Sequence, residues 1–331
     1  MSIRLSRERL QALLHSARGK RIAVVGDAML DVYLRGDVQR ISPEAPVPVV
    51  TVRQRTHALG GAANVAQNVV AVGARCDLVA TVGHDVAADT VREMLRRLGA
   101  NHESVLSIDR CTTQKTRIVA RSQQLVRVDE EDNADLSPAD VLRLLEQVRR
   151  VVETADAVVL EDYNKGVLVQ DVIAEVMRLA AERSLPVVVD PKYRNFFLYR
   201  GATIFKPNVR ELEAALGAAV DVEHPETLPS TLLRLGVSNI LLTLGERGMA
   251  LFSTDGEVAR VPTVAREVYD VVGAGDTVTA YLATMLASGA TPLEAAWIAN
   301  VAAGIEVGKL GAATVTAEEL MAYVEQEGLS G

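Results

Sequence analysis

The segment from Asp270 to Thr277, DVVGAGDT, carries the residues of this sequence best suited to chemistry. Gly273, Ala274 and Gly275 are small enough for their successive backbone N–H groups to converge on an anion, and the helical run that follows adds its positive dipole end. Asp276 would lie in the first turn of that helix, where a carboxylate can take the proton of a hydroxyl that attacks a phosphoryl group. The alternative is a tight turn in which Asp276 only caps the helix.

A second glycine-containing segment, GGAANVAQNVVAVG, starts at Gly60. Gly60 and Gly61 permit a close backbone approach, and the side-chain amide of Asn64 offers donors and an acceptor to a polar ligand. Asp27 ends the first apolar run, with Asp31 one turn later, and a carboxylate at the end of a strand can bind sugar hydroxyls. The structural alternatives are a glycine-capped helix start and a turn.

Two further segments suit a nucleotide. In KPNVRE, Asn208 and Glu211 could lie near phosphates and Mg²⁺, or they could form a capping box, which by itself accounts for both residues. Thr243, Gly245 and Gly248 follow an apolar run and are typical of a loop on the nucleotide side.

Basic residues recur between positions 110 and 128 with no acid among them. Such a cationic face could hold a substrate phosphate, although a solvated face explains the same charges. Lys115, Arg117 and Arg121 share parity and would lie on one face of a continuous strand. The candidate phosphate ligands are Lys115, Arg117, Arg121, Arg127 and, after a later apolar run, Lys165.

These residues need a scaffold, and short β-branched apolar runs alternate with helical runs along the chain. Because several runs are apolar at nearly every position, helices must cover both faces of their sheet, which predicts an α/β fold with a mostly parallel sheet. Ligands would lie beyond the carboxyl ends of its strands. Strands are expected at 22–26, 77–82, 157–160, 186–189, 203–205, 240–244 and 249–252. Helices are expected in the N-terminal segment and at 61–73, 85–98, 138–154, 169–183, 208–217, 275–288, 291–308 and 316–326.

Two segments interrupt this alternation. Residues 33–54 contain three prolines, which suit edge strands and turns, and residues 112–130 have the alternating polarity of a hairpin. We expect both to form a small β-lid over the ligand end of one domain that spans residues 1–331. Because proline-rich edge strands are often covered by a partner, a homodimer joined through the lids is expected.

The composition limits the classes of function. With 49% hydrophobic and 24% charged residues among 331, the chain can build a sizeable core and is not disordered. The formal net charge of −8 argues against a general nucleic-acid or anionic-membrane surface. No apolar run approaches the length of a membrane span. Two isolated cysteines suggest a reducing compartment and the five histidines lack metal-ligand spacing, so a cytoplasmic protein without a histidine–cysteine metal site is expected.

The order of these motifs resembles that of the ribokinase family of sugar kinases, also called the PfkB family. GGAAN lies in the first quarter, NxxE follows a middle strand and DxxGAGDT lies in the last quarter, and the similarity covers essentially the whole chain. The resemblance implies a three-layer α/β sandwich with a β-lid, the use of ATP and Mg²⁺, and phosphorylation of a sugar hydroxyl. It also implies that Asp276 is the base and that Gly273, Ala274 and Gly275 form the anion hole.

The same resemblance implies roles for the remaining candidates. Family members often use a monovalent cation such as K⁺ near the first aspartate of DxxGAGD, here Asp270. Because Val271 and Val272 stand where many members carry threonine, such a cation would rely on Asp270 and backbone carbonyls. The residues on the nucleotide side would be Asn208, Glu211 (toward Mg²⁺ through water), Thr243, Gly245, Gly248 and Asn300. The residues that hold the sugar would be Asp27, Asp31, Gly60, Gly61 and Asn64.

The segments ISPEAPVPVV, EDYNKG, SQQLVRVD, EVYDVVGAGDTV and VGKLGAATV are similar to the family members that phosphorylate D-glycero-β-D-manno-heptose 7-phosphate at O1, on the route to ADP-heptose and the lipopolysaccharide inner core. A phosphorylated substrate would give the basic hairpin a purpose. No HxGH nucleotide-binding motif precedes Gly331, so a stand-alone kinase is expected. The alternatives are a kinase for another sugar, such as ribose or fructose 1-phosphate, and a binding regulator without turnover. A nicotinamide dehydrogenase is disfavoured because no GxGxxG follows the first apolar run.

Overall fold

The computed structural model describes residues 5–121, 123–221, 228–265, 268–309, 311 and 313–328. The helices are α1 Arg7–Ala17, α2 Ala62–Ala71, α3 Val86–Leu98, α4 Pro138–Val152, α5 Gln170–Glu182, α6 Val209–Leu216, α7 Leu228–Leu235, α8 Ala274–Ala287, α9 Pro292–Glu306 and α10 Ala317–Gln326. The strands are β1 Arg21–Gly26, β2 Ala28–Ile41, β3 Pro48–Gly61, β4 Arg75–Val82, β5 Val105–Ser107, β6 Gln114–Ala120, β7 Gln123–Glu130, β8 Ala157–Glu161, β9 Val187–Asp190, β10 Ile204–Phe205, β11 Asn239–Thr243, β12 Met249–Ser253 and β13 Val258–Val261. Of these helices, none combines the length and the apolar character that a bilayer crossing requires.

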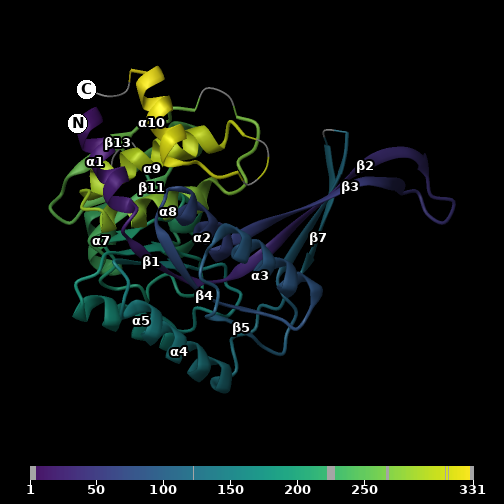
Figure 1. Cartoon of the computed structure of the whole chain (residues 1–331), viewed down its shortest axis with the longest axis horizontal. Coiled ribbons are helices and arrows are strands. Elements are labelled where there is room, and N and C mark those ends of the chain that lie inside the picture. The colour runs from purple at the N-terminus through teal and green to yellow at the C-terminus, as the bar shows by residue number, and fades with distance from the viewer. Residues whose placement is uncertain are drawn as a thin grey trace.

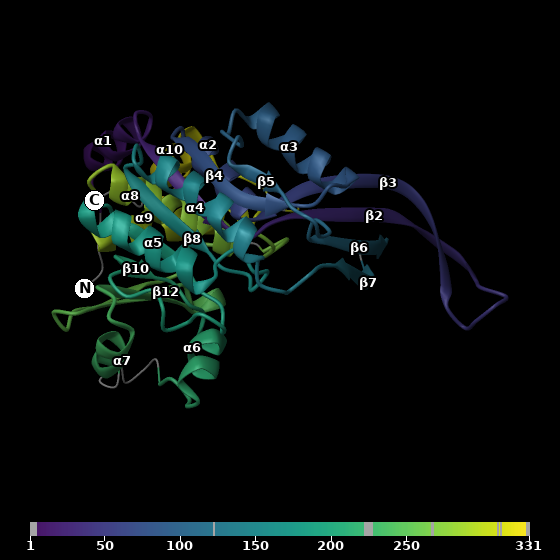
Figure 2. The same cartoon turned by 90° about the horizontal axis from the view of Figure 1, so that it is seen from below.

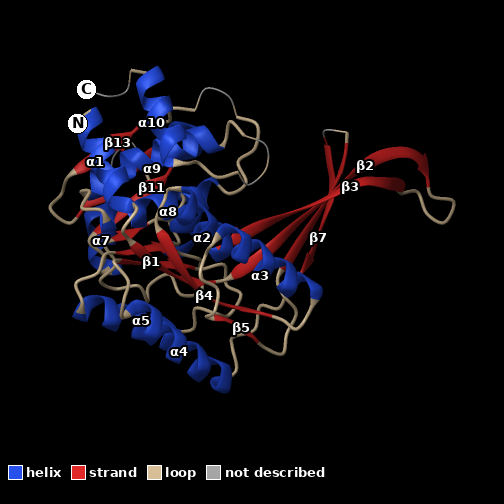
Figure 3. Ribbon diagram, viewed as in Figure 1, coloured by secondary structure: helices blue, strands red, loops and turns tan. Residues whose placement is uncertain are grey.

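Nine strands form one large sheet, in the order β13-β12-β11-β10-β9-β8-β1-β4-β5. Figure 3 shows the strands in red, with helices on either side of them. Every pair from β11 to β5 is parallel, whereas β12 and β13 run antiparallel at one edge. The mostly parallel sheet predicted from the apolar runs is therefore confirmed. Parallel strands end at a common edge, so residues distant in the sequence gather there.

Helices cover both faces of the large sheet (Figure 2). Successive residues of β1 show why: Val24 and Val25 are both fully buried, but in two separate apolar clusters, one on each face. Helices α1, α2, α3, α8, α9 and α10 contribute to the cluster around Val24, and α4, α5, α6 and α7 contribute to the other. Burying each valine or leucine stabilises the fold by roughly 1.5–3 kcal/mol, which is why strands apolar at every position need helices on both sides.

A second, smaller sheet has the order β3-β2-β6-β7, and we call it the small sheet. The β2–β3 hairpin projects well beyond the body of the molecule (Figure 1). The prediction of edge strands over 33–54 holds for β3, which begins at Pro48 and lies at the edge, but it is wrong for β2, which lies between β3 and β6. The prolines at 43 and 46 fall in the connection between the two strands and remove no donor from β2.

Candidate active site

The polar residues gather where the parallel strands of the large sheet end and α8 begins. Asp27 follows β1, Glu161 and Asp190 are the last residues of β8 and β9, and Lys206 follows β10. All four side chains are buried. Burial of so many charged groups at one edge of a sheet indicates a functional site, because isolated buried charges destabilise a fold.

Helix α8 presents its amino end to this edge. Its N-cap is Gly273, whose φ of 100° lies in the left-handed region that glycine adopts without strain, and Ala274 and Gly275 open the first turn. Asp276 lies in the same turn and is only 5% exposed. Its carboxylate makes hydrogen bonds to other side chains and does not cap the helix, so the capping alternative does not describe it.

Two side chains hold the Asp276 carboxylate. Asn64 donates from Nδ2 to Oδ2 at 2.8 Å, and the Tyr163 hydroxyl donates to Oδ1 at 3.0 Å. Asn68 in turn donates to the Asn64 carbonyl and accepts from the Thr277 hydroxyl. The GGAAN and GAGD motifs, 212 residues apart, therefore meet in one buried hydrogen-bond network.

Burial raises the pKa of Asp276 to about 6, and the charge of Asp190 adds to the effect. The hydrogen bonds from Asn64 and Tyr163 and the charge of Lys206 act in the opposite direction. A carboxylate with a pKa near the pH at which it works is well matched to general-base catalysis.

Three carboxylates, from Glu161, Asp190 and Asp276, offer oxygen atoms that all lie within 4.8 Å of one another, and no other such cluster exists in the described part of the chain. Lys206 donates from Nζ to Asp190 Oδ2 at 2.7 Å. Both carboxylate oxygens of Glu161 lack a hydrogen-bond partner among the described residues. Burial and the charges of Asp190 and Asp276 raise the pKa of Glu161. Hard oxygen donors with unbalanced charge fit Mg²⁺, the divalent ion that the resemblance implies.

On the expected nucleotide side, the capping box explains the NxxE pattern directly. Asn208 accepts from the Glu211 N–H and Glu211 accepts from the Asn208 N–H, each at 2.9 Å. The other oxygen of Glu211 pairs with Lys192. A role for Glu211 at Mg²⁺ stays a prediction.

The other nucleotide-side candidates lie in three places. Thr243 forms a β-bridge with Asn208, so these two are brought together. Gly245 begins the short 3₁₀ turn of residues 245–247, Gly248 follows it, and both have positive φ. Asn300 donates to the Pro262 carbonyl at 2.8 Å. A nucleotide role for each of the four stays a prediction.

The predicted sugar-side residues also meet. Gly61 has a φ of 55°, and a Cβ there would lie 2.4 Å from the Asp27 carbonyl, so only glycine fits. Asn64 follows in α2. Asp31 forms an ion pair with Arg117 and lies close to Gly60.

The Asp27 carboxylate accepts three backbone N–H groups, from residues 163, 165 and 167, at 2.8–3.2 Å. Hydrogen bonds to backbone N–H groups are what the structural alternative, Asp27 as a turn residue, predicts. A sugar contact for this residue stays a prediction.

The basic candidates are not equivalent. Arg117 pairs with Asp31, Arg127 with Asp129, and Lys165 with Glu131. Lys115 Nζ lies 5.3 Å from the centroid of the Tyr163 ring, inside the site.

The parity prediction fails for Arg121. The strand β6 ends one residue earlier, at Ala120, after an irregularity between Ile118 and Val119. Arg121 is exposed in the turn with a φ of 57°. It therefore does not share a strand face with Lys115 and Arg117.

Asp270 precedes α8, and its Oδ1 accepts the Val272 N–H at 3.0 Å. A monovalent cation at Asp270 stays a prediction. The sequence reasoning missed Glu161, Tyr163, Asp190, Lys192 and Lys206. Each lies within three residues of the carboxyl end of an expected strand, and this placement was the signal that could have identified them.

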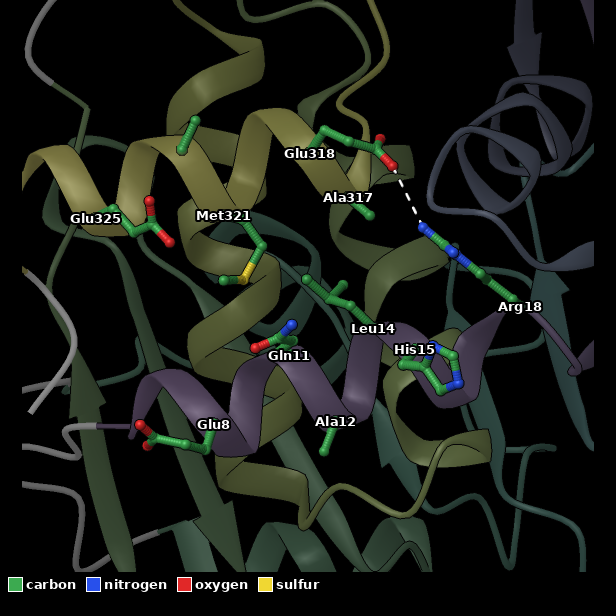
Figure 4. A pocket seen from close by; sticks show the side chains of 11 residues that line it. Glu8, Gln11, Ala12, Leu14, His15, Arg18, Ala317, Glu318, Met321 and Glu325 are labelled. Atoms are coloured by element: carbon green, nitrogen blue, oxygen red, sulfur yellow. Dashed lines mark ion pairs between the residues drawn. The ribbon is translucent and has the colours of Figure 1, made fainter.

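A separate hollow of about 740 Å³ lies between α1 and α10 (Figure 4). Leu14 and Met321 lie in it, and Arg18 pairs with Glu318 at its rim at 3.6 Å. None of its lining residues belongs to the buried cluster at the strand ends, so the chemistry described above does not extend to it.

The whole arrangement is a ribokinase-like α/β fold. The chain matches the structure of Arabidopsis thaliana ribokinase complexed with ribose and ATP with a TM-score of 0.74, at 22% identity, over 93% of this chain and 99% of that one. It matches a ribokinase from Thermotoga maritima with a TM-score of 0.71, at 24% identity, over 92% and 99%. These matches confirm the predicted fold class.

Residues 20–319 match the model of the pfkB family of carbohydrate kinases. The chain belongs to this family, and the prediction of a sugar kinase is confirmed. It is 47% identical over 327 residues to a protein of Rhodospirillum rubrum named "Bifunctional protein HldE", a match that covers 97% of this chain and 65% of that protein. The chain thus spans about two thirds of the length of this relative.

Proposed function

We propose that this sugar kinase phosphorylates D-glycero-β-D-manno-heptose 7-phosphate at O1 with ATP, a step toward ADP-heptose and the lipopolysaccharide inner core. The identity to proteins named HldE supports this substrate, together with the heptose-kinase segments of the sequence. Those relatives are named bifunctional, and this chain matches about two thirds of their length. The kinase activity is the one that we propose for this chain.

The chemistry follows from the amino end of α8. The anomeric O1–H oxygen of the sugar attacks the γ-phosphorus of ATP, its proton passes to the Asp276 carboxylate, and the bond from the γ-phosphorus to the β,γ-bridging oxygen breaks to release ADP. The N–H groups of Gly273, Ala274 and Gly275 stabilise the negative charge on the transferring group. General-base assistance of this kind contributes roughly 10²–10⁴ in rate.

Glu161 and Asp190 are the residues that would hold Mg²⁺, directly or through water, with Lys192 and Lys206 balancing their charge. When bound, the ion supplies neutralisation of phosphate charge. We also propose that a monovalent cation binds beside Asp270.

The small sheet serves in this proposal as a lid that excludes water from the reacting groups. Lys115 on β6 is the side chain that binds the substrate's phosphate, because its ammonium group faces the site without an ion pair among the described residues. Exposed hydrophobic side chains on the outer part of the small sheet support a homodimer formed through it. These are Ile41, Val52, Leu125, Val126 and Val128, with Val47 in the connection between β2 and β3.

One observation carries the proposal: a buried carboxylate, Asp276, lies in the first turn of a helix whose glycine-rich amino end faces the ends of the sheet strands. The test is an ADP-release assay with heptose 7-phosphate, ribose and fructose 1-phosphate. We expect turnover with the heptose phosphate well above the other two, and a loss of at least about 10²-fold in Asp276→Asn.

Asp276→Asn should retain its melting temperature and its affinity for ADP. Wild-type turnover in that variant would remove Asp276 from the mechanism. Preference for ribose or fructose 1-phosphate would reassign the substrate, and binding of sugar and ATP without ADP release would indicate a regulator.

A further inference from the structure

Tyr163 joins parts of the site that come from distant segments. It lies two residues beyond the last residue of β8, and its hydroxyl donates to Asp276 Oδ1 at 3.0 Å. The opposite oxygen of that carboxylate accepts from Asn64 at 2.8 Å. A carboxylate held at both oxygens cannot rotate about its Cβ–Cγ bond without losing one of these hydrogen bonds.

The backbone that carries Tyr163 is itself fixed. The Tyr163 N–H donates to Asp27 Oδ2 at 2.8 Å, and the N–H groups of Lys165 and Val167 donate to the same carboxylate at 3.0 and 3.2 Å. Asn164 between them has a φ of 55°, a conformation that is sparsely populated outside glycine. A loop tied down in this way can hold a side chain in one place, as a preorganised site requires.

The Tyr163 ring contacts both sides of the site. Lys115 Nζ, from the small sheet, lies 5.3 Å from the ring centroid, and Lys192 Nζ, from the loop after β9, lies 5.1 Å from it. Lys192 also pairs with Glu211 of the α6 capping box. One aromatic ring therefore adjoins a cation on the proposed sugar side and another on the proposed nucleotide side, in cation–π geometry.

We propose that Tyr163 is a positioning residue for phosphoryl transfer, whose hydroxyl holds the Asp276 carboxylate in the orientation that accepts the sugar proton. The proposal rests on the proposed role of Asp276 as the base. A carboxylate oxygen accepts more than one hydrogen bond, so Oδ1 retains a lone pair for the attacking hydroxyl. Small errors in the placement of a reacting group cost about 10²-fold in rate, so the orientation of this carboxylate affects turnover directly.

The test is a double-mutant cycle between Tyr163→Phe and Asp276→Asn, with kcat and both KM values measured in the presence of sugar phosphate and ATP. Tyr163→Phe keeps the ring beneath the two lysines and removes only the hydroxyl. We expect kcat to fall about 10- to 100-fold, with both KM values within about twofold. In the Asp276→Asn background, the same change should leave the residual rate unaltered, because the residue it acts through is already lost.

Tyr193→Phe is the matched control, since its side chain is 70% exposed, and it should behave as wild type. Tyr163→Leu separates the ring from the hydroxyl: it should reproduce the loss in kcat and also raise the KM for the sugar phosphate about two- to fivefold, because Lys115 loses its aromatic contact. Melting temperature and ADP affinity identify any variant that is misfolded.

The inference is overturned if Tyr163→Phe retains wild-type kcat, or if it lowers the rate equally in the wild-type and Asp276→Asn backgrounds, which would indicate a general structural effect. Failure of the proposed function has a different signature. In that case Asp276→Asn itself would turn over normally, whatever Tyr163→Phe does.

Discussion

Among the basic residues near the small sheet, Lys115 differs in what its ammonium group faces. Arg117 and Lys165 each face a carboxylate, and Arg121 points from an exposed turn. Lys115 faces an aromatic ring, and burial lowers its pKa from the ordinary lysine value. A partly desolvated cation without an ion pair gains most from an incoming phosphate, because no existing bond must be broken.

At this scale we predict that Lys115→Ala raises the KM for the sugar phosphate roughly tenfold or more, because a charge-assisted hydrogen bond is lost. The KM for ATP should change less than about twofold. Arg121→Ala, a matched removal of charge from the hairpin turn, should leave both constants unchanged. Equal increases in the two KM values for Lys115→Ala would refute its assignment to the sugar phosphate.

The residue types of the site could be predicted from the sequence, but the partners of those residues could not. The motifs around Asn64 and Asp276 marked both residues, although neither motif indicates that the two side chains share a hydrogen bond. The ion pair of Arg117 with Asp31 joins β6 to β2, and such a pairing depends on how the strands are arranged. Tyr163 was missed because an aromatic residue after a strand has an ordinary explanation in packing.

At the scale of elements, α9 ends in Glu306, an acidic residue that is unusual in being buried. The Glu306 side chain is completely buried, and neither carboxylate oxygen has a hydrogen-bond partner among the described residues. Burial, with contributions from the charges of Asp270 and Asp276, raises its pKa to about 8. In the unfolded chain the same group has a pKa of about 4.3. Between these values the native state keeps a proton that the unfolded state has lost, so stability falls as the pH rises toward 8.

We therefore predict that Glu306→Gln, which does not titrate, has a melting temperature close to wild type at pH 5 and a clearly higher one at pH 8.5. Each kcal/mol corresponds to roughly 2–4 °C in a protein of this size. Scanning calorimetry would measure this, in a buffer without added potassium, the cation proposed beside Asp270. Glu318→Gln, whose side chain is 75% exposed, is the control and should show no such trend. A difference between Glu306→Gln and wild type that does not vary with pH would contradict the assignment.

Most elements of the fold were predictable because their periodicity is strong. The helix α4 repeats apolar residues at helical spacing, and β8 is buried at all five positions. The strand β5 was missed because three residues are too few to show a period. The strand β13 alternates buried and exposed positions within four residues, which an irregular loop can imitate.

At the scale of the whole molecule, the small sheet is the part least covered by the rest of the protein. The residues Val126 and Val128 of β7 are each 47% exposed. They share parity on the strand, so they lie on one face of the sheet. Apolar side chains gathered on a projecting sheet expose surface that association would remove from water.

We predict that the wild-type protein has twice the chain mass in light scattering at micromolar concentration, and that Val126→Asp with Val128→Asp converts it to a monomer. Leu142→Asp is the control, because Leu142 is 65% exposed on α4, away from the small sheet. A monomeric wild type, or dissociation caused by Leu142→Asp alone, would refute a dimer through the small sheet.

The reach of the β2–β3 hairpin was not predictable, although its turn residues were. The prolines near 43–48 indicate where the chain reverses, but the strands extend back to Ala28 and forward to Gly61. The inner part of β2, Leu30–Gly36, is also paired in parallel with β6, a neighbour from a segment distant in the sequence that no local pattern indicates.

One of the connections between the two sheets is a single residue long. Strand β1 ends at Gly26 and β2 begins at Ala28, so Asp27 alone separates them. Its carboxylate is bound to the loop that carries Tyr163. A tilt of the small sheet relative to β1 would turn the backbone at Asp27 and pull on the same loop. Opening of the small sheet would then also loosen the loop that positions Tyr163 and, through it, Asp276. An open enzyme would therefore be catalytically inactive as well.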